Sequence, residues 1–124
     1  MRIFTSPAVR YLLRCSVLFL LVLGQAGWAM SIRELRALER LQPKQGADFA
    51  VYYLVGTMEA TVYLDEASVR AGAAPRLCLN GRRLEPAMAL SIYKSELRRN
   101  ADLYEADMPV PLVMFNALAT VYPC

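Results

Sequence analysis

Hydrophobic residues dominate the end of the chain, where residues 108–124 include no charged side chain. Apolar positions in this segment repeat at helical spacing on one side, and more apolar residues cover most of the other side. Helices with apolar residues on nearly every side are usually buried in the protein core. Pro111 suits the first helical position, whereas Pro123 cannot continue a helix. The pattern predicts a buried helix of about 12 residues, roughly 18 Å long, around which the rest of the chain folds.

A shorter amphipathic helix is predicted over residues 31–41. Ser31 and Glu34 have the spacing of a capping box, in which each side chain bonds a free backbone N–H at the start of a helix. One apolar stripe follows and ends at Gln42-Pro43. Its members are Ile32, Leu35, Leu38 and Leu41.

Residues 49–67 are ambiguous between a hairpin and a helix. Their β-branched and aromatic residues would allow two strands with a turn at Gly56-Thr57. Helical spacing over five turns favours one long helix, with Asp48 as its N-cap. The stripe that keeps this spacing is Phe49, Tyr52, Tyr53, Gly56, Ala60, Tyr63 and Ala67. Such an aromatic stripe is first a packing device, so we expect it in the core, where Gly56 and Ala60 let another helix approach closely. A tyrosine-lined ligand pocket is the alternative.

The remaining segments complete an all-α pattern. A loop of small residues over 69–75 is followed by an Asn80-Gly81 turn and by a helix that Leu84 and Pro86 open. Leu90, Tyr93 and Leu97 mark the apolar face of that helix, and Asn100 ends it. An acidic connector over 102–107 leads to the last helix. The prediction is a small compact domain of about four helices around the buried C-terminal helix.

The N-terminal segment has the features of a cleaved secretory signal. Three arginines precede an apolar run over residues 15–24, and Ala26-Gly27-Trp28-Ala29 offers small residues at both positions that signal peptidase reads. The apolar run is shorter than the roughly 20 residues that a spanning helix needs, which disfavours an uncleaved membrane anchor. We therefore predict a signal peptide over residues 1–29, a domain over 30–124 and a periplasmic location without a stable membrane anchor. The three arginines are Arg2, Arg10 and Arg14.

Removal of that segment changes both the charge and the cysteine count. Fourteen basic residues less three leave 11, against 11 acidic ones, so the mature chain is neutral and gives no support for nucleic-acid binding. Cys78 and Cys124 remain as an even pair in an oxidising compartment, which indicates one disulfide. Such a crosslink is worth roughly 4 kcal/mol in the chain-entropy model. A zinc site would need four ligands, and the chain has no histidine.

The absence of histidine also excludes Ser-His and Cys-His nucleophilic catalysis. Carboxylates are the only acid or base groups left, and we expect both acidic groups on solvated surfaces. These groups are Asp65 with Glu66, and Asp102 with Glu105 and Asp107. Phosphate-binding glycine loops are absent. We predict a protein that is not an enzyme and that uses no metal or cofactor.

Several of these features together resemble the Rap/Tai family of immunity proteins. The resemblance runs from a helix with Tyr53, Gly56 and Ala60, through Cys78-Leu79 and the next helix, to an apolar last helix that ends in Tyr122-Pro123-Cys124. It covers about residues 49–124. Family members commonly have Pro or Glu after the Cys-Leu pair, and a Thr before the helix leucine, where this chain has Asn80 and Arg83.

The resemblance implies a small helical periplasmic protein, often a homodimer, that binds and blocks a peptidoglycan amidase delivered by a type VI secretion system. A blocker of this kind needs a rigid scaffold that presents a loop. The turn beside the predicted disulfide is our candidate for the partner-binding loop, although an ordinary exposed turn has the same sequence pattern. Its residues are Asn80, Gly81, Arg82 and Arg83. The alternative function is a small carrier of apolar ligands or lipids, and a carboxylate-only enzyme has the least support.

Overall fold

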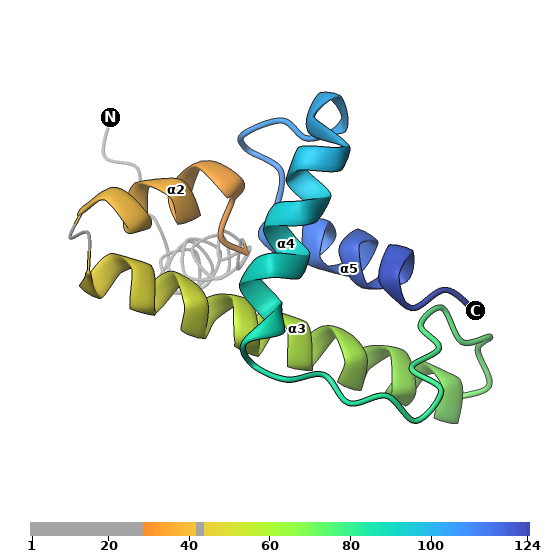
Figure 1. Cartoon of the computed structure of the whole chain (residues 1–124). Coiled ribbons are helices and arrows are strands. Elements are labelled where there is room, and N and C mark those ends of the chain that lie inside the picture. The colour runs from red at the N-terminus through yellow and green to blue at the C-terminus, as the bar shows by residue number, and fades with distance from the viewer. Residues whose placement is uncertain (1–28, 42–43) are drawn as a thin grey trace, which may run out of the picture.

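The computed structural model describes residues 29–41 and 44–124. Within these ranges the structure is helical, and an isolated bridge between Ser31 and Pro109 is its only β-type pairing. This confirms the predicted all-α class (Figure 1). The helices are α2 (Ile32–Leu41), α3 (Gln45–Arg70), α4 (Met88–Arg99), the short 3-10 helix η1 (Ala101–Leu103) and α5 (Val110–Val121).

The predicted signal peptide lies almost entirely outside the described residues, because the structure begins at Ala29. The Gln42-Pro43 stop of the first helix also lies outside them, and α2 is described up to Leu41. None of the helices in the described ranges has the length and hydrophobicity required to span a bilayer.

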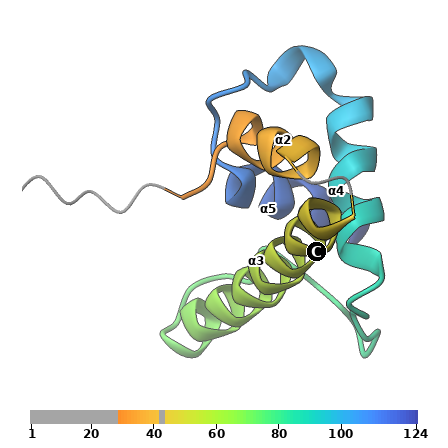
Figure 2. The same cartoon turned by 90° about the vertical axis from the view of Figure 1, so that its left-hand side faces the viewer.

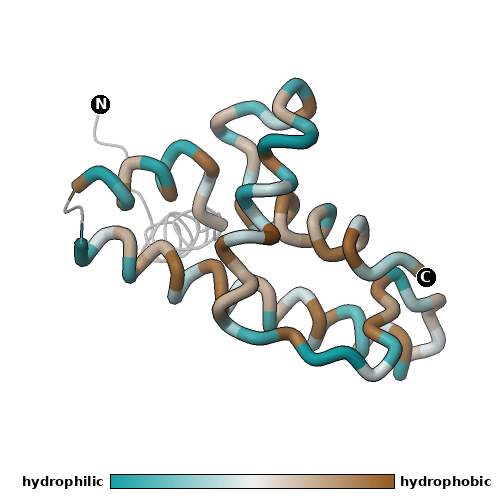
Figure 3. The backbone as a smooth tube through the Cα atoms, in the orientation of Figure 1, coloured by the Kyte–Doolittle hydropathy of each residue, from teal (hydrophilic) through white to brown (hydrophobic). Residues whose placement is uncertain are grey.

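The C-terminal helix α5 lies at the centre of the core, as its pattern predicts. Its buried side chains face α3 and α4, and Figure 3 shows α5 as a mostly hydrophobic segment, in contrast to the alternating α2. The buried residues are Val110, Val113, Met114, Ala117 and Leu118. Burial is less complete than the sequence suggests, since Leu112 and Val121 are exposed. Pro111 is the second residue of the helix, where its missing N–H leaves no backbone bond unmade.

The capping box at the start of α2 is confirmed. The Ser31 N–H donates to the Glu34 carboxylate at 2.7 Å, and the Glu34 N–H donates to the Ser31 hydroxyl at 3.3 Å. The bond from the Ser31 backbone lowers the pKa of Glu34 below its usual value. The Val110 N–H donates to the Met30 carbonyl at 2.9 Å, which ties the chain before α2 to the start of α5.

Residues 49–67 form one helix, so the helical interpretation is confirmed and the hairpin is excluded. The predicted N-cap is wrong, because α3 begins at Gln45 and Lys44 precedes it without a side-chain cap. Asp48 lies in the first turn, where its carboxylate faces the positive end of the helix dipole.

The predicted core stripe of α3 is also wrong. Three of its four aromatic residues, Phe49, Tyr52 and Tyr63, face solvent, and only Tyr53 is half-buried. The buried residues of α3 include Ala50, Leu54 and Met58 instead. The physical reason is that α3 carries apolar residues on two sides, and α2, α4 and α5 all pack on the same one. Figure 2 shows these three helices above α3. The expected close helix approach at Gly56 is therefore absent within the described chain, since a Cβ at this position would meet nothing within 4 Å.

The helix predicted to open at Leu84 and Pro86 is α4, and it begins later, at Met88. It ends at Arg99, and Asn100 follows as its C-cap residue, in agreement with the predicted stop. Tyr93 is buried, and the predicted face also includes the half-buried Leu90 and Leu97.

A buried carboxylate, Glu96, organises the connector after α4. Its Oε1 accepts a bond from Asn100 Nδ2 at 2.8 Å and one from the Tyr104 hydroxyl at 2.7 Å. Asn116 Nδ2, on α5, donates to the same hydroxyl at 3.0 Å. Burial is the main reason that the pKa of Tyr104 is raised. This network holds the connector against α4 and α5.

Candidate functional site

The disulfide predicted between Cys78 and Cys124 is present, with the two Cα atoms 4.9 Å apart. A backbone bond lies beside it, because the Cys78 N–H donates to the Tyr122 carbonyl at 3.0 Å. The loop after α3 is therefore attached to the end of α5 by a covalent and a hydrogen bond.

Asp65 attaches the same loop to α3. The residue is only 4% exposed, so the predicted solvated position is wrong for Asp65. The carboxylate accepts bonds from the backbone N–H of Arg76 at 3.3 Å and of Leu77 at 3.1 Å. Arg76 Nε lies 3.4 Å from it. A buried carboxylate stays favourable when it is paired and hydrogen-bonded, so Asp65 serves the fold here.

The four predicted partner-binding residues form one exposed turn. Asn80 has φ 50° and Gly81 has φ 77°, and the Arg82 N–H donates to the Leu79 carbonyl at 3.0 Å. Two consecutive residues with positive φ are characteristic of a type I′ turn, which Asn-Gly pairs favour. Arg82 also donates through Nε to the Leu79 carbonyl at 3.1 Å, and its guanidinium lies 4.5 Å from the centre of the Tyr122 ring. Arg83 extends from the same turn into solvent.

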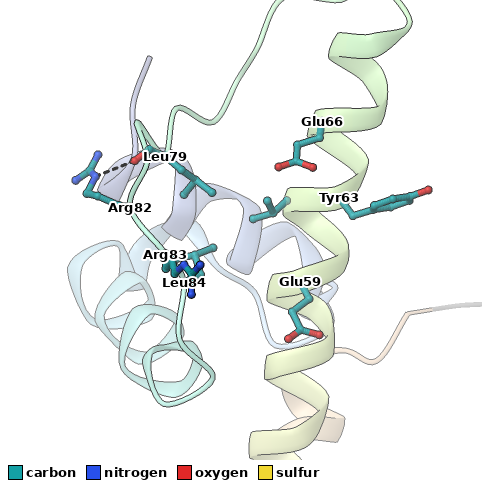
Figure 4. Close-up of a pocket in the computed structure, with 8 residues that line it drawn as sticks. Glu59, Tyr63, Glu66, Leu79, Arg82, Arg83 and Leu84 are labelled. Atoms are coloured by element: carbon teal, nitrogen blue, oxygen red, sulfur yellow. Dashed lines mark hydrogen bonds between the residues drawn. The ribbon is translucent and has the colours of Figure 1, made fainter.

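A groove of about 380 Å³ separates this turn from α3. Figure 4 shows Glu66 pointing from α3 toward the turn, while Tyr63 points away from it. In the ranges that the structure covers, Arg82 and Arg83 form no ion pair with a carboxylate. The groove thus has carboxylates on its α3 wall and two guanidinium groups on its loop wall. The other residues that line it are Glu59, Val62, Leu79 and Leu84.

The other four members of the two predicted acidic groups lie on the solvated surface, as expected. Glu66, Asp102, Glu105 and Asp107 are all exposed. The described residues contain no cluster of three or more Asp, Glu or Cys side chains that could hold a metal ion.

The carrier alternative requires tyrosines around an apolar interior. Tyr52 and Tyr63 instead lie on the outer side of α3, so the predicted tyrosine-lined interior is wrong in its placement. Tyr53 is half-buried and lines an open surface groove with Gly56 and Leu64.

Sequence reasoning missed three contributions to this region. Tyr122 supports the turn through the Arg82 guanidinium, Glu59 and Glu66 form the facing wall, and Asp65 holds the base of the loop. Only Asp65 carried a usable signal, because it falls on the buried side of α3 once Leu54 and Met58 are assigned to the core.

Comparison with known proteins adds no relative: no family model, no curated protein and no solved structure matches this chain. The resemblance to the Rap/Tai family therefore stays a prediction, and no family membership is shown.

Proposed function

We propose that this protein is a periplasmic immunity protein that binds and occludes a peptidoglycan amidase toxin of a type VI secretion system. The class of partner comes from the resemblance to the Rap/Tai family. The observation that supports occlusion is the rigid attachment of the exposed 80–83 turn, both in the chain that precedes it and within the turn itself. The disulfide of Cys78 and the carboxylate of Asp65 fix the chain before the turn, and Arg82 stacks on Tyr122 within it.

Rigid attachment matters because a blocking loop must bind without losing much conformational freedom. A loop that is already ordered avoids part of the entropy cost of association. Arg83 is exposed and has no carboxylate partner among the described side chains, so it is free to meet an acidic group at the rim of a partner's cleft. Arginine is also one of the residue types enriched at the energetic centres of protein interfaces.

The proposal predicts that an amidase toxin is encoded beside this gene, and the test uses that toxin. The toxin is directed to the periplasm of a test strain, and the chain is co-expressed with its own N-terminal segment. We expect co-expression to prevent lysis and the two purified proteins to form a stable complex. Absence of a complex and of protection would overturn the proposal.

A matched pair of charge reversals tests the turn. Arg83→Glu should raise the dissociation constant of the complex at least about tenfold, since a like charge would replace a favourable one at the interface. Arg98→Glu is the control, because Arg98 is an exposed arginine on α4, outside the groove. Equal effects of the two substitutions would show that the turn is not the binding surface.

Native mass spectrometry distinguishes the carrier alternative. A carrier purified under mild conditions should retain a small molecule, whereas a blocking protein should have the mass of the polypeptide alone.

A further inference from the structure

A pocket of about 230 Å³ lies between α2 and α4, and we call it the α2–α4 pocket. Both helices lie above α3 in Figure 1. Because α2 packs mainly on α3, and α4 on α3 and α5, side chains rather than close backbone contacts fill the space between α2 and α4. The residues that line this pocket differ from those that line the groove beside the 80–83 turn. The pocket is therefore distinct from the surface that the proposed function uses.

The charged side chains of the α2–α4 pocket are mainly cationic. Arg36, Lys94 and Arg98 contribute three positive charges and Glu39 one negative charge, which leaves a net charge of +2. Lys94 Nζ lies 3.5 Å from the Glu39 carboxylate. Arg98 Nη2 donates to the Ser95 hydroxyl at 3.3 Å, which occupies one of its N–H groups. In the part of the chain that the structure describes, Arg36 and Arg98 form no ion pair, so both guanidinium groups can bind an anion.

The hydroxyl of Tyr93 is a second, independent feature of this pocket. Tyr93 lines the pocket, yet it is only 4% exposed, and its hydroxyl has no hydrogen-bond partner among the described residues. Buried hydroxyl groups in folded proteins nearly always have such a partner. Burial raises the pKa of Tyr93 to about 12, and Arg36 and Glu39 change the same pKa by smaller amounts. The hydroxyl is therefore directed toward α2, across the pocket.

We propose that the α2–α4 pocket binds a phosphate group, either as the free ion or as the head of a small phosphate monoester. A phosphate oxygen accepts the hydrogen bond that the Tyr93 hydroxyl can donate, while Arg36 and Arg98 bind further oxygens through their N–H groups. A phosphate monoester carries a charge of about −1.5 to −2 at neutral pH, which matches the net charge of the pocket. A carboxylate, with a single charge, would leave part of that positive charge uncompensated.

The size and the lining of the pocket fit a small ligand of this class. Its volume of about 230 Å³ lies below the range of about 300–1,000 Å³ that is usual for drug-sized ligands. Leu35 and Leu97 also line it and would contact the organic part of a monoester. Arg36 and Lys94 are exposed, and exposed side chains change rotamer within picoseconds to nanoseconds. A ligand can therefore reach the hydroxyl of Tyr93 from the surface.

Titration calorimetry of the purified, disulfide-bonded protein in a buffer without phosphate tests the inference. The probes are inorganic phosphate and glycerol 3-phosphate, and chloride at the same ionic strength is the reference, because salt screens non-specific attraction equally. We expect a single saturable site for at least one probe. Tighter binding of glycerol 3-phosphate would assign the site to a monoester, and equal or weaker binding would assign it to the free ion. Binding of both probes no tighter than that of chloride would overturn the inference.

Tyr93→Phe is the decisive variant, because it removes the hydroxyl and leaves the ring in the core. We expect the dissociation constant for phosphate to rise at least about tenfold, since a hydrogen bond to a charged group is lost. Arg36→Gln should have a similar effect, and it decides the matter if Tyr93→Phe does not fold. Arg33→Gln is the matched control, because Arg33 is an exposed arginine of α2 that does not line the pocket.

Thermal unfolding provides a second readout, because a ligand stabilises only the protein that binds it. Added phosphate should raise the melting temperature of the wild type and of Arg33→Gln, and it should raise that of Tyr93→Phe and Arg36→Gln much less. Equal shifts in all four proteins would show attraction by the overall surface charge and would overturn the pocket. Neither experiment contains a toxin, so failure here is distinct from a failure of the proposed function.

Discussion

At the scale of single residues, the buried polar groups differ in whether they have hydrogen-bond partners, and this difference decides whether each group stabilises the fold. Asp65 is matched by backbone N–H groups, and the Oε1 of Glu96 by Asn100 and Tyr104. The Oε2 of Glu96 has no hydrogen bond in the described part of the chain, but Arg99 lies 3.8 Å from it. The hydroxyl of Tyr93 is buried without a hydrogen-bond partner in the described part of the chain. A buried polar group without a partner loses its bonds to water and regains nothing, so this hydroxyl should not stabilise the fold.

The prediction at this scale concerns Tyr93. Burial raises its pKa to about 12, while Arg36 lowers and Glu39 and Tyr53 raise it by smaller amounts. The unfolded chain loses this proton near pH 10, so below pH 10 both states keep the proton and the side chain adds no pH dependence. As the pH rises from 10 toward 12, the unfolded state is favoured, and the free energy of unfolding should fall by up to about 2–3 kcal/mol.

Tyr93→Phe provides the measurement. The free energy of unfolding, measured with urea at a series of pH values, should fall less between pH 10 and 12 in the variant than in the wild type. At neutral pH the variant should be as stable as the wild type, or more stable, because the removed hydroxyl has no partner. A loss of about 1 kcal/mol or more at neutral pH would indicate a hydrogen bond that the structure does not contain.

At the scale of elements, glycine has opposite roles at two positions of α3. Gly46 is buried where α2 crosses α3, and a Cβ there would collide with the carbonyl oxygen of Leu38. Gly56 instead faces open space, because a Cβ at this position would meet nothing within 4 Å. Packing between α2 and α3 therefore requires glycine at position 46, whereas no contact within the described chain requires it at position 56.

Alanine substitutions at the two glycines should therefore differ in sign. Gly46→Ala should destabilise the protein by about 1–3 kcal/mol, since the new methyl group forces α2 and α3 apart. Gly56→Ala should stabilise the monomer by about 0.5–1 kcal/mol through helix propensity. Thermal or urea unfolding at high dilution measures both, and similar changes in the two variants would contradict the assigned packing.

At the scale of the whole molecule, both ends of the described domain are tied to distant segments. The chain at Met30 bonds to the start of α5, and Cys124 is linked to Cys78. The disulfide and Asp65 act on the same loop from opposite sides, so the exposed 80–83 turn depends on contacts from α3 and from the C-terminus.

Loss of the disulfide should have a large effect on overall stability. The double variant Cys78→Ser and Cys124→Ser should unfold with a free energy about 4 kcal/mol lower than that of the oxidised protein. Reduction of the wild type should lower its stability by a similar amount, whereas the same reductant should leave the double variant unchanged. Equal stability of the oxidised and reduced protein would show that the link is not a structural one.

The sequence by itself determined the helices at 31–41, around 84–100 and near the C-terminus, because periodicity, the Ser31–Glu34 capping box and the Asn100 stop act within a few residues of chain. For residues 49–67 it favoured a helix but left a hairpin open. It also determined the disulfide, since only two cysteines remain outside the predicted leader. For α5 it determined the environment as well, because a helix without charges has to be buried.

Only the tertiary structure decided which side of α3 is buried, because two apolar sides meet the same periodicity and the choice depends on where α2, α4 and α5 pack. That choice moved Tyr52 to the surface and Asp65 into the interior. The tertiary structure also placed the Arg82 guanidinium over the Tyr122 ring. These residues are 40 positions apart, so no local sequence pattern encodes their contact. Burial of a given side chain is a property of its neighbours in space, and a single sequence specifies them only through the completed fold.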